Sequence, residues 1–128
     1  MRHEFADRYL MDRVNTATPA ELTGMVFDVG VTSLKAADAA IAARQPADAH
    51  RHLMKAQEAV LELRCSLRLD AGELMRQLDM LYEYLYNRIV FANVKKDAAV
   101  VADCLAILEP LRAAWREACL GRVPAAAA

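Results

Sequence analysis

The sequence predicts an all-α protein, namely an antiparallel four-helix bundle with a short N-terminal helix or arm. Two observations predict it. Apolar residues recur every three or four positions along four long segments, and no segment alternates apolar and polar residues as a strand does. The links between these segments are short, and short links between helices of about 20 to 25 residues make consecutive helices antiparallel.

The 128 residues suit one domain, which is long enough for a core but too short for two domains of normal size. Hydrophobic residues make up 56% and charged residues 26%, as in a globular rather than a disordered chain. We divide the chain into an arm over residues 1–17, a bundle over 18–121 and a disordered tail over 122–128.

The first helix is predicted to begin in "NTATPAEL". Thr18 can cap the helix, Pro19 suits its first position, and Glu21 completes a capping box. The helical period then continues to about Arg44, where Gln45-Pro46 breaks it. Its apolar positions are Leu22, Met25, Val26, Val29, Ser33, Ala36, Ala37, Ala40 and Ile41.

The other three helices follow the same logic. The second carries an apolar seam, meaning the line of residues that faces the other helices. The third is predicted from about Glu73 to Val94, and Asp97 can cap the fourth, which ends before Gly121. Trp115 is expected to be buried in the bundle. The seam of the second helix is Ala49, Leu53, Ala56, Val60, Leu63 and Leu67, and that of the fourth is Val101, Cys104, Leu105, Leu108, Leu111, Trp115 and Ala118.

Three residues disturb these helical segments. Gly24 and Gly30 each cost up to about 1 kcal/mol relative to alanine in a helix. They either let another backbone come close or are tolerated without a role. Pro110 removes a backbone donor and is expected to bend the fourth helix.

Charge and hydropathy exclude several function classes. A formal net charge of -1 gives no field that attracts nucleic acid or an anionic membrane. No apolar run reaches the ~18 residues of a membrane span, and the charged N-terminus is not a secretory signal, so we expect a cytoplasmic protein without membrane insertion. Cys65, Cys104 and Cys119 are expected to be small buried hydrophobes in a reducing compartment.

We find no constellation for catalysis, a metal or a cofactor. Glu-x-x-His pairs, phosphate loops and nucleophile elbows are missing from the sequence, and His50 and His52 fall on opposite sides of a helix. One alternative remains, because "HRHLMKAQ" resembles the phosphoacceptor histidine of His-phosphotransfer domains, with His52 followed by Lys55 and Ala56. Otherwise we expect no enzyme activity.

The third helix has more apolar surface than one stripe requires. In "LYEYLYNRIVFANV" the core stripe leaves Tyr84 and Phe91 on a different side, where Met80 joins them. Met54, Leu61 and Cys65 form a similar line beside the seam of the second helix. A bundle helix touches two neighbours, which accounts for part of this surplus. The remainder predicts a binding module with a hydrophobic groove.

Several blocks resemble the FliS family of flagellin-specific export chaperones. They are a tyrosine ahead of the first helix (Tyr9), then "VNTATPAELTGMVFDVG", "AQEAVLELRCSLRLDAGEL", "LDMLYEYLYNRIVFAN" with Asp97 after it, and "ILEPLRAAW". Their order and spacing extend the resemblance from about Phe5 to Ala118. One departure is Val26-Phe27, where the family more often has leucine and tyrosine.

The resemblance implies a cytoplasmic chaperone that binds the disordered C-terminal segment of flagellin and so prevents polymerisation before export. It implies an antiparallel four-helix bundle with an N-terminal arm, and neither nucleotide nor metal. The export apparatus and a second copy of the free protein are further possible partners. A regulator-binding adaptor is the alternative that some relatives suggest.

The candidate contact residues combine the surplus apolar surface with the arm. Tyr82 and Tyr86 lie near the seam and could instead belong to the core. For the arm we expect Tyr9 and Leu10 to occupy the groove until flagellin arrives. The full set is Tyr9, Leu10, Met54, Leu61, Tyr82, Tyr84, Tyr86, Phe91 and Asn93.

Overall fold

The computed structural model describes residues 16–121, and α-helices make up most of this range. The helices are α2 (Pro19–Ala42), α3 (Pro46–Cys65), α4 (Glu73–Lys95) and α5 (Ala98–Cys119), and a short 3-10 turn, η1 (Leu69–Ala71), precedes α4. Within residues 16–121 there is no strand, so the all-α prediction is confirmed. The predictions for Tyr9, Leu10 and the tail over 122–128 fall outside the described residues.

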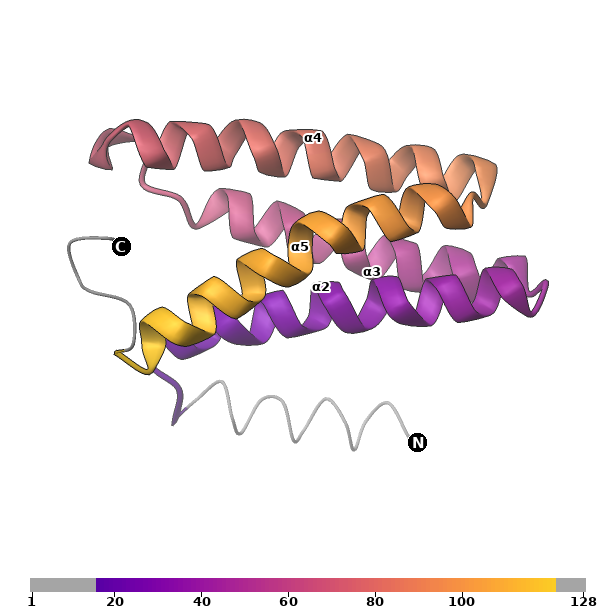
Figure 1. Cartoon of the computed structure of the whole chain (residues 1–128), viewed down its shortest axis with the longest axis horizontal. Coiled ribbons are helices and arrows are strands. Elements are labelled where there is room, and N and C mark those ends of the chain that lie inside the picture. The colour runs from indigo at the N-terminus through magenta and orange to yellow at the C-terminus, as the bar shows by residue number, and fades with distance from the viewer. Residues whose placement is uncertain (1–15, 122–128) are drawn as a thin grey trace.

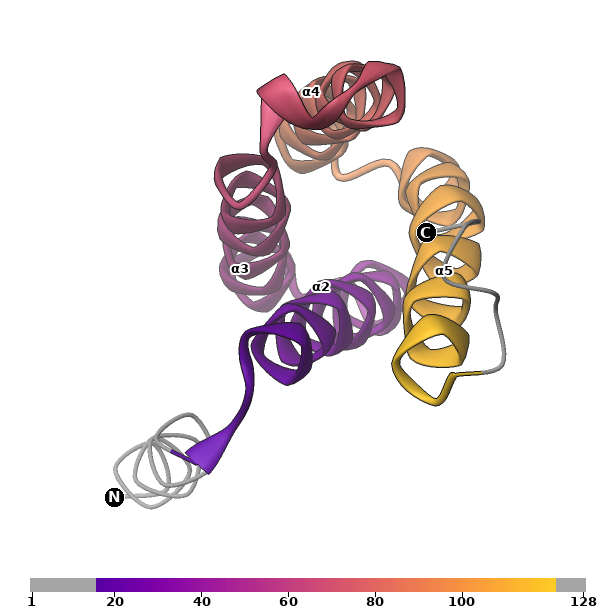
Figure 2. The same ribbon diagram turned by 90° about the vertical axis from the view of Figure 1, so that its left-hand side faces the viewer.

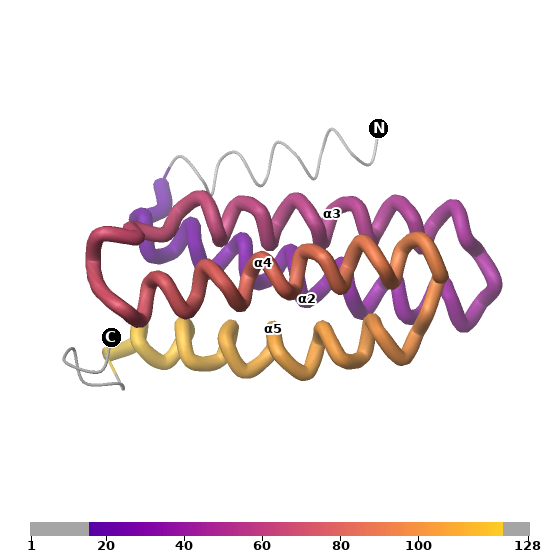
Figure 3. Tube along the Cα trace, turned by 90° about the horizontal axis from the view of Figure 1, so that it is seen from above, coloured from indigo at the N-terminus to yellow at the C-terminus, as the bar shows by residue number. Residues whose placement is uncertain are grey.

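Consecutive helices run antiparallel and form a four-cornered bundle. Seen end-on, α2, α3, α4 and α5 occupy the corners in this order, so each helix has two neighbours (Figure 2). The side view shows the α2–α3 turn at one end of the bundle and the α3–α4 link at the other (Figure 3). α5 runs obliquely, from beside the end of α4 to beside the start of α2 (Figure 1). The predicted antiparallel four-helix bundle is therefore the observed fold.

Side-chain caps fix the starts of α2 and α5. The Glu21 N–H donates to Thr18 Oγ1 over 3.1 Å, and Pro19 is the first residue of α2. The Asp97 carboxylate accepts from the Ala99 N–H over 3.0 Å at the start of α5. These bonds satisfy backbone donors that the first turn of a helix cannot pair internally. Both caps were predicted from the sequence.

The core is one continuous layer between the four helices. Each helix contributes a leucine or isoleucine that is wholly buried, and burying such a side chain stabilises the fold by about 1.5–3 kcal/mol. The buried apolar cluster is Phe27, Val31, Leu34, Ala37, Leu53, Ala56, Val60, Leu63, Tyr82, Leu85, Ile89, Ala92, Val100, Val101, Cys104 and Leu108.

The two glycines of α2 make room for side chains, not for another backbone as the sequence suggested. A Cβ at Gly30 would lie 2.9 Å from Leu108 Cδ2 of α5 and 3.6 Å from Ala59 Cβ of α3. A Cβ at Gly24 would lie 3.7 Å from Trp115 Cδ1. Gly30 thus marks a place where a side chain of α5 packs directly on the backbone of α2.

Trp115 is half-buried, so the expectation of a buried tryptophan is wrong. It lies near the end of α5, where its Nε1–H donates to the Ala20 carbonyl over 2.9 Å at the start of α2. Its ring centre is 6.2 Å from that of Phe27. Pro110 does not interrupt α5, which is continuous from Ala98 to Cys119.

Only one of the three cysteines lies in the core. Cys104 is buried, and burial raises the pKa of its thiol to about 11. Cys65 and Cys119 are exposed, contrary to the prediction. Each is the last residue of its helix, where the chain extends past the core.

Candidate functional site

Large apolar side chains remain on the surface of the bundle. Four of the predicted contact residues are exposed: Met54 by 39%, Leu61 by 46%, Tyr84 by 53% and Phe91 by 43%. Apolar residues exposed together on one helix face mark sites where a partner binds. The other large exposed apolar residues are Leu69, Leu74, Met80, Val94 and Leu120.

Tyr82 belongs to the core rather than to the surface. It is 4% exposed and packs in the same cluster as Leu85 and Ile89. Burial raises the pKa of its hydroxyl to about 12. A partner cannot touch this side chain in the observed conformation, so we remove Tyr82 from the candidate site. Tyr86, four residues on, is half-buried at the edge of the core.

Asn93 is also buried, and local hydrogen bonds account for it. Lys96 Nζ donates to Asn93 Oδ1 over 2.7 Å. This fixes the amide so that Asn93 Nδ2 faces His50 Nδ1 of α3 at 3.0 Å. The side chain joins the start of α3 to the end of α4, and we remove Asn93 from the candidate site as well.

The side of α4 that faces α3 is marked by two contacts between these helices. Arg64 of α3 pairs with Asp79 over 2.7 Å, and His50 of α3 meets Asn93. Tyr86 is seven residues from each of these α4 positions. Seven residues are about two helical turns, so Tyr86 lies on the same side.

Tyr84 and Phe91 lie on the other side of α4, away from α3. Each is two residues from Tyr86 or Asn93, which turns it through about 200° at 100° per residue. On α3, Met54 and Leu61 flank the line of contact with α4. These residues form two surfaces: the α3–α4 surface of the exposed Met54 and Leu61 with the half-buried Tyr86, and the α4 outer surface of Met80, Tyr84 and Phe91.

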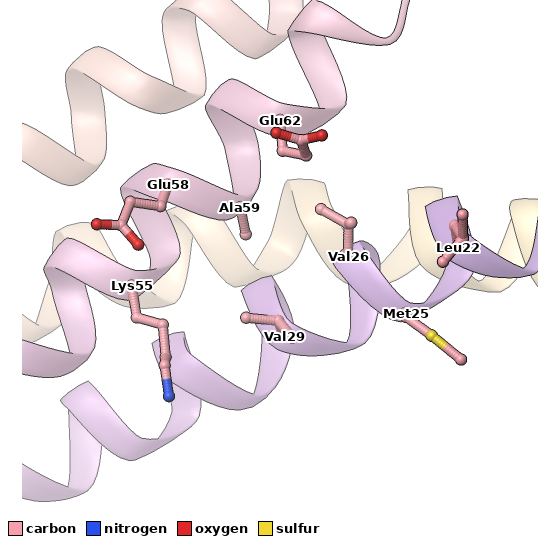
Figure 4. Close-up of a pocket in the computed structure, with 8 residues that line it drawn as sticks. All are labelled: Leu22, Met25, Val26, Val29, Lys55, Glu58, Ala59 and Glu62. Carbon is pink, nitrogen blue, oxygen red and sulfur yellow. The ribbon is translucent and has the colours of Figure 1, made fainter. Parts of the chain in front are cut away.

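A third surface is a groove of about 510 Å³ between α2 and α3. Figure 4 shows Val26 and Val29 of α2 directed toward α3, with Ala59 opposite them. A smaller hollow of about 240 Å³ shares some of these residues and extends the groove to the start of α2. The groove residues are Leu22, Met25, Val26, Val29, Lys55, Glu58, Ala59 and Glu62.

The groove has an apolar floor and a charged rim. Its floor comes from α2, whereas Lys55, Glu58 and Glu62 stand along the α3 side (Figure 4). The helical period did not predict this site, because it places the apolar residues of α2 on the side that faces the core. A signal was present: the apolar residues of α2 cover more than half of the helix circumference, so one flank remains after the core is filled.

The described residues form no metal centre. Within residues 16–121, no group of three or more His, Cys, Asp or Glu side chains is placed to hold a metal ion. His50 is exposed and His52 is half-buried, on different sides of α3. No helix in the described range is long and apolar enough to cross a membrane.

Comparison with known proteins decides the family. The family model described as "Flagellar protein FliS" matches residues 1–122. The chain belongs to the FliS family. It is 34% identical to the flagellar secretion chaperone FliS of Bacillus subtilis (strain 168), across 86% of this chain and 82% of that relative. It is 27% identical to the flagellar secretion chaperone FliS of Vibrio cholerae, across 80% of this chain and 76% of the relative.

A solved structure supports the fold of this FliS family member. The bundle is similar to a crystal structure of a flagellar chaperone from bacteria, with a TM-score of 0.73. The match covers 94% of this chain and 99% of that chain at 18% sequence identity. The family is one of flagellar secretion chaperones, a class of binding proteins. It favours the chaperone hypothesis over phosphotransfer through His52.

Proposed function

We propose that this chain is a cytoplasmic export chaperone that binds the disordered C-terminal segment of flagellin and prevents polymerisation before export. Membership of the FliS family supports an export substrate as partner. The observation that carries the proposal is the open apolar groove between α2 and α3. An apolar groove of this kind on a folded domain is typical of a site where a partner segment binds.

Binding would be coupled to folding of the flagellin segment. Apolar residues of the segment would cover Val26 and Val29. Each Å² of apolar surface removed from water would contribute about 25 cal/mol to the free energy of binding. Part of this gain offsets the cost of ordering the segment. Lys55 and Glu58 on the rim would meet polar groups at the edge of the bound segment. No chemical step is required.

The segment would reach beyond the groove. The α3–α4 surface and the α4 outer surface carry further exposed apolar residues, including Leu61 and Tyr84. One helix cannot cover surfaces on different sides of a bundle. We therefore propose that the flagellin segment passes over more than one side and contacts the α2–α3 groove together with at least one of the other two surfaces.

The arm over residues 1–17 is proposed to compete for the same apolar surface. Tyr9 and Leu10 would occupy it in the free protein and lower the apparent affinity for flagellin. Deleting residues 1–12 should then promote dimers and strengthen or preserve binding of a flagellin C-terminal peptide. Weaker peptide binding would instead make Tyr9 a direct contact. If neither property changes, the arm has no such role.

The test is a polymerisation assay with monomeric flagellin from the same organism. Equimolar chaperone should bind the monomer and suppress the rise in light scattering when filament seeds are added. Flagellin that lacks its C-terminal segment is the matched control for binding and should not associate. Seeded growth at an unchanged rate, with no complex in size-exclusion chromatography, would contradict the proposal and leave the regulator-binding adaptor as the alternative.

A further inference from the structure

Arg88 is half-buried on the side of α4 that faces away from α3. Its guanidinium carbon lies 5.1 Å from the centre of the Phe91 ring, a cation–π distance. Its Nε is buried and has no hydrogen-bond partner. A partner cannot reach the buried Nε, so only the two terminal nitrogens of the guanidinium can bind one.

The other arginines of the described chain make the contrast clear. Within residues 16–121, all but Arg44 and Arg88 form an ion pair with an Asp or Glu, and Arg44 is exposed in the turn after α2. Among the arginines of residues 16–121, Arg88 is thus half-buried and forms no ion pair with a carboxylate of that range. The paired arginines are Arg51, Arg64, Arg68, Arg76, Arg112 and Arg116.

No acidic residue within residues 16–121 forms an ion pair with Arg88. Asp79 and Glu83 of α4 both pair with Arg64 of α3. Asp103 of α5 and Arg88 act on the same buried thiol: Arg88 lowers the pKa of Cys104 and Asp103 raises it, while burial dominates. Nevertheless, no ion pair joins Arg88 to Asp103 among the described residues. The positive charge of Arg88 therefore has no carboxylate paired with it within residues 16–121.

Arg88 is part of a longer pattern along α4. Tyr84, Arg88, Phe91 and Lys95 follow one another at spacings of four, three and four residues, which places them on one helix face. Tyr84, Phe91 and Lys95 are exposed. We call these four residues the α4 cationic–aromatic stripe. Its two rings and two cations complement a segment that has apolar side chains and carboxylates, not one that is apolar throughout.

We propose that the α4 cationic–aromatic stripe is a second anchor for the flagellin segment, and that Arg88 binds the carboxylate of an Asp or Glu on that segment. This inference rests on the proposed function. The two terminal nitrogens of the planar guanidinium match a carboxylate with two parallel hydrogen bonds. Packing on Phe91 holds the group in place before binding, so little side-chain entropy is lost when the carboxylate arrives. The anchor selects client segments with an acidic residue among apolar ones.

The test is a double-mutant cycle by titration calorimetry on the full chain. The probe is the C-terminal segment of the flagellin from the same organism, in its natural form and with each Asp and Glu replaced by Asn or Gln. Arg88→Met should weaken binding of the natural segment about 10-fold or more, as for a hydrogen bond to a charged group. The same variant should bind the neutralised segment as wild type does, since no carboxylate remains to be lost.

Two variants serve as controls. Arg76→Met removes an exposed arginine of the same helix that pairs with Glu73, and it should leave affinity within about 2-fold. Arg88→Lys keeps the charge but not the planar fork and should recover only part of the binding. Melting curves of each variant establish that α4 is folded.

The results separate the two proposals. Equal affinity of wild type and Arg88→Met for the natural segment would overturn the role of Arg88 while leaving the chaperone function intact. So would an equal loss with the natural and the neutralised segment, because the effect would then not depend on a carboxylate. If wild type fails to bind either segment, the proposed function itself fails.

Discussion

Two sides of α2 carry apolar or small residues, but only one is closed by a neighbouring helix. On the α5 side, Leu108 fills the space above Gly30, and Arg112 and Arg116 pair with Asp28 at the edge. On the outer α3 side, residues such as Val29 line a groove that the side chains of α3 do not fill. The same helix thus supplies both a packed interface and a candidate binding site.

The residues of the partner helix make the difference. α5 offers the large side chains of Leu108 and Trp115 where α2 has glycines. α3 offers the small Ala59 and, beside it, Lys55 and Glu58, whose charged ends stay in water. Large side chains of α5 that pack on the glycines of α2 close that interface. Alanine and long charged residues of α3 opposite the valines of α2 leave the floor of the groove exposed. Whether an apolar helix face becomes part of the core or a binding site therefore depends on the size and charge of the side chains on the facing helix.

The closed side should respond most strongly to added volume. Gly30→Leu places a side chain where a Cβ alone would already lie 2.9 Å from Leu108 Cδ2. We expect a loss of about 3 kcal/mol in the free energy of unfolding, the upper range for overpacking. Urea denaturation measures it, with Gly24→Ala as control, since a Cβ there has 3.7 Å to Trp115. A Gly30→Leu protein as stable as wild type would mean that this side is not tightly packed.

The open side should respond in binding instead. Val29→Asp puts a carboxylate on the groove floor and should weaken binding of the flagellin C-terminal segment by about 2 kcal/mol, the cost of losing a binding hot spot. Its melting temperature should change little because Val29 is partly solvated already. Ala39→Asp, an exposed position ten residues further along α2, is the control. Equal affinities of the two variants would remove the groove from the site.

The sequence predicted the fold because fold information is local and repeated. Apolar residues at steps of three and four defined each helix. Thr18 and Asp97 marked the starts of α2 and α5. The core residues on these lines, such as Leu53 and Leu108, are buried as the period indicates. Local rules suffice when each helix buries one stripe against its neighbours.

The site was less predictable because it depends on which helix stands opposite. Periodicity alone could not tell that Val29 would face small and charged residues of α3. It separated Tyr84 from the seam but left Tyr82 ambiguous, and the structure buries Tyr82. Asn93 was predicted to contact a partner because its pairing with His50, 43 positions away in the chain, could not be seen in the sequence. Long-range pairs of this kind leave no mark in a helical period.

The α4 outer surface tests whether exposure alone makes a binding site. Tyr84→Ala and Phe91→Ala should each weaken flagellin binding by about 1–2 kcal/mol, as aromatic contact residues do. Stability should stay within about 0.5 kcal/mol of wild type because both side chains are exposed. Fluorescence anisotropy with a labelled flagellin segment measures the first effect and thermal melting the second. Full affinity in both variants would restrict the binding site to other surfaces.

The closed interior also predicts a dependence of stability on pH. Burial raises the pKa of Cys104 from 9.0 to about 11 and that of Tyr82 from 10.0 to about 12. Between these values the unfolded chain loses protons that the folded chain keeps, so stability falls as pH rises above about 9. We expect a loss of about 1 kcal/mol by pH 9.5, most of it from Cys104. Urea midpoints that show the same slope in Cys104→Ala would contradict this assignment.

Methyl NMR of the full chain, titrated with the flagellin C-terminal segment, tests the contrast between the two sides of α2 most directly. The methyl groups of Leu22, Val26 and Val29 line the groove, whereas those of Leu34 and Leu108 lie in the closed interior. The open groove predicts large shift changes for the first set and small ones for the second. Saturable binding that leaves all three groove residues unperturbed would contradict a client site between α2 and α3.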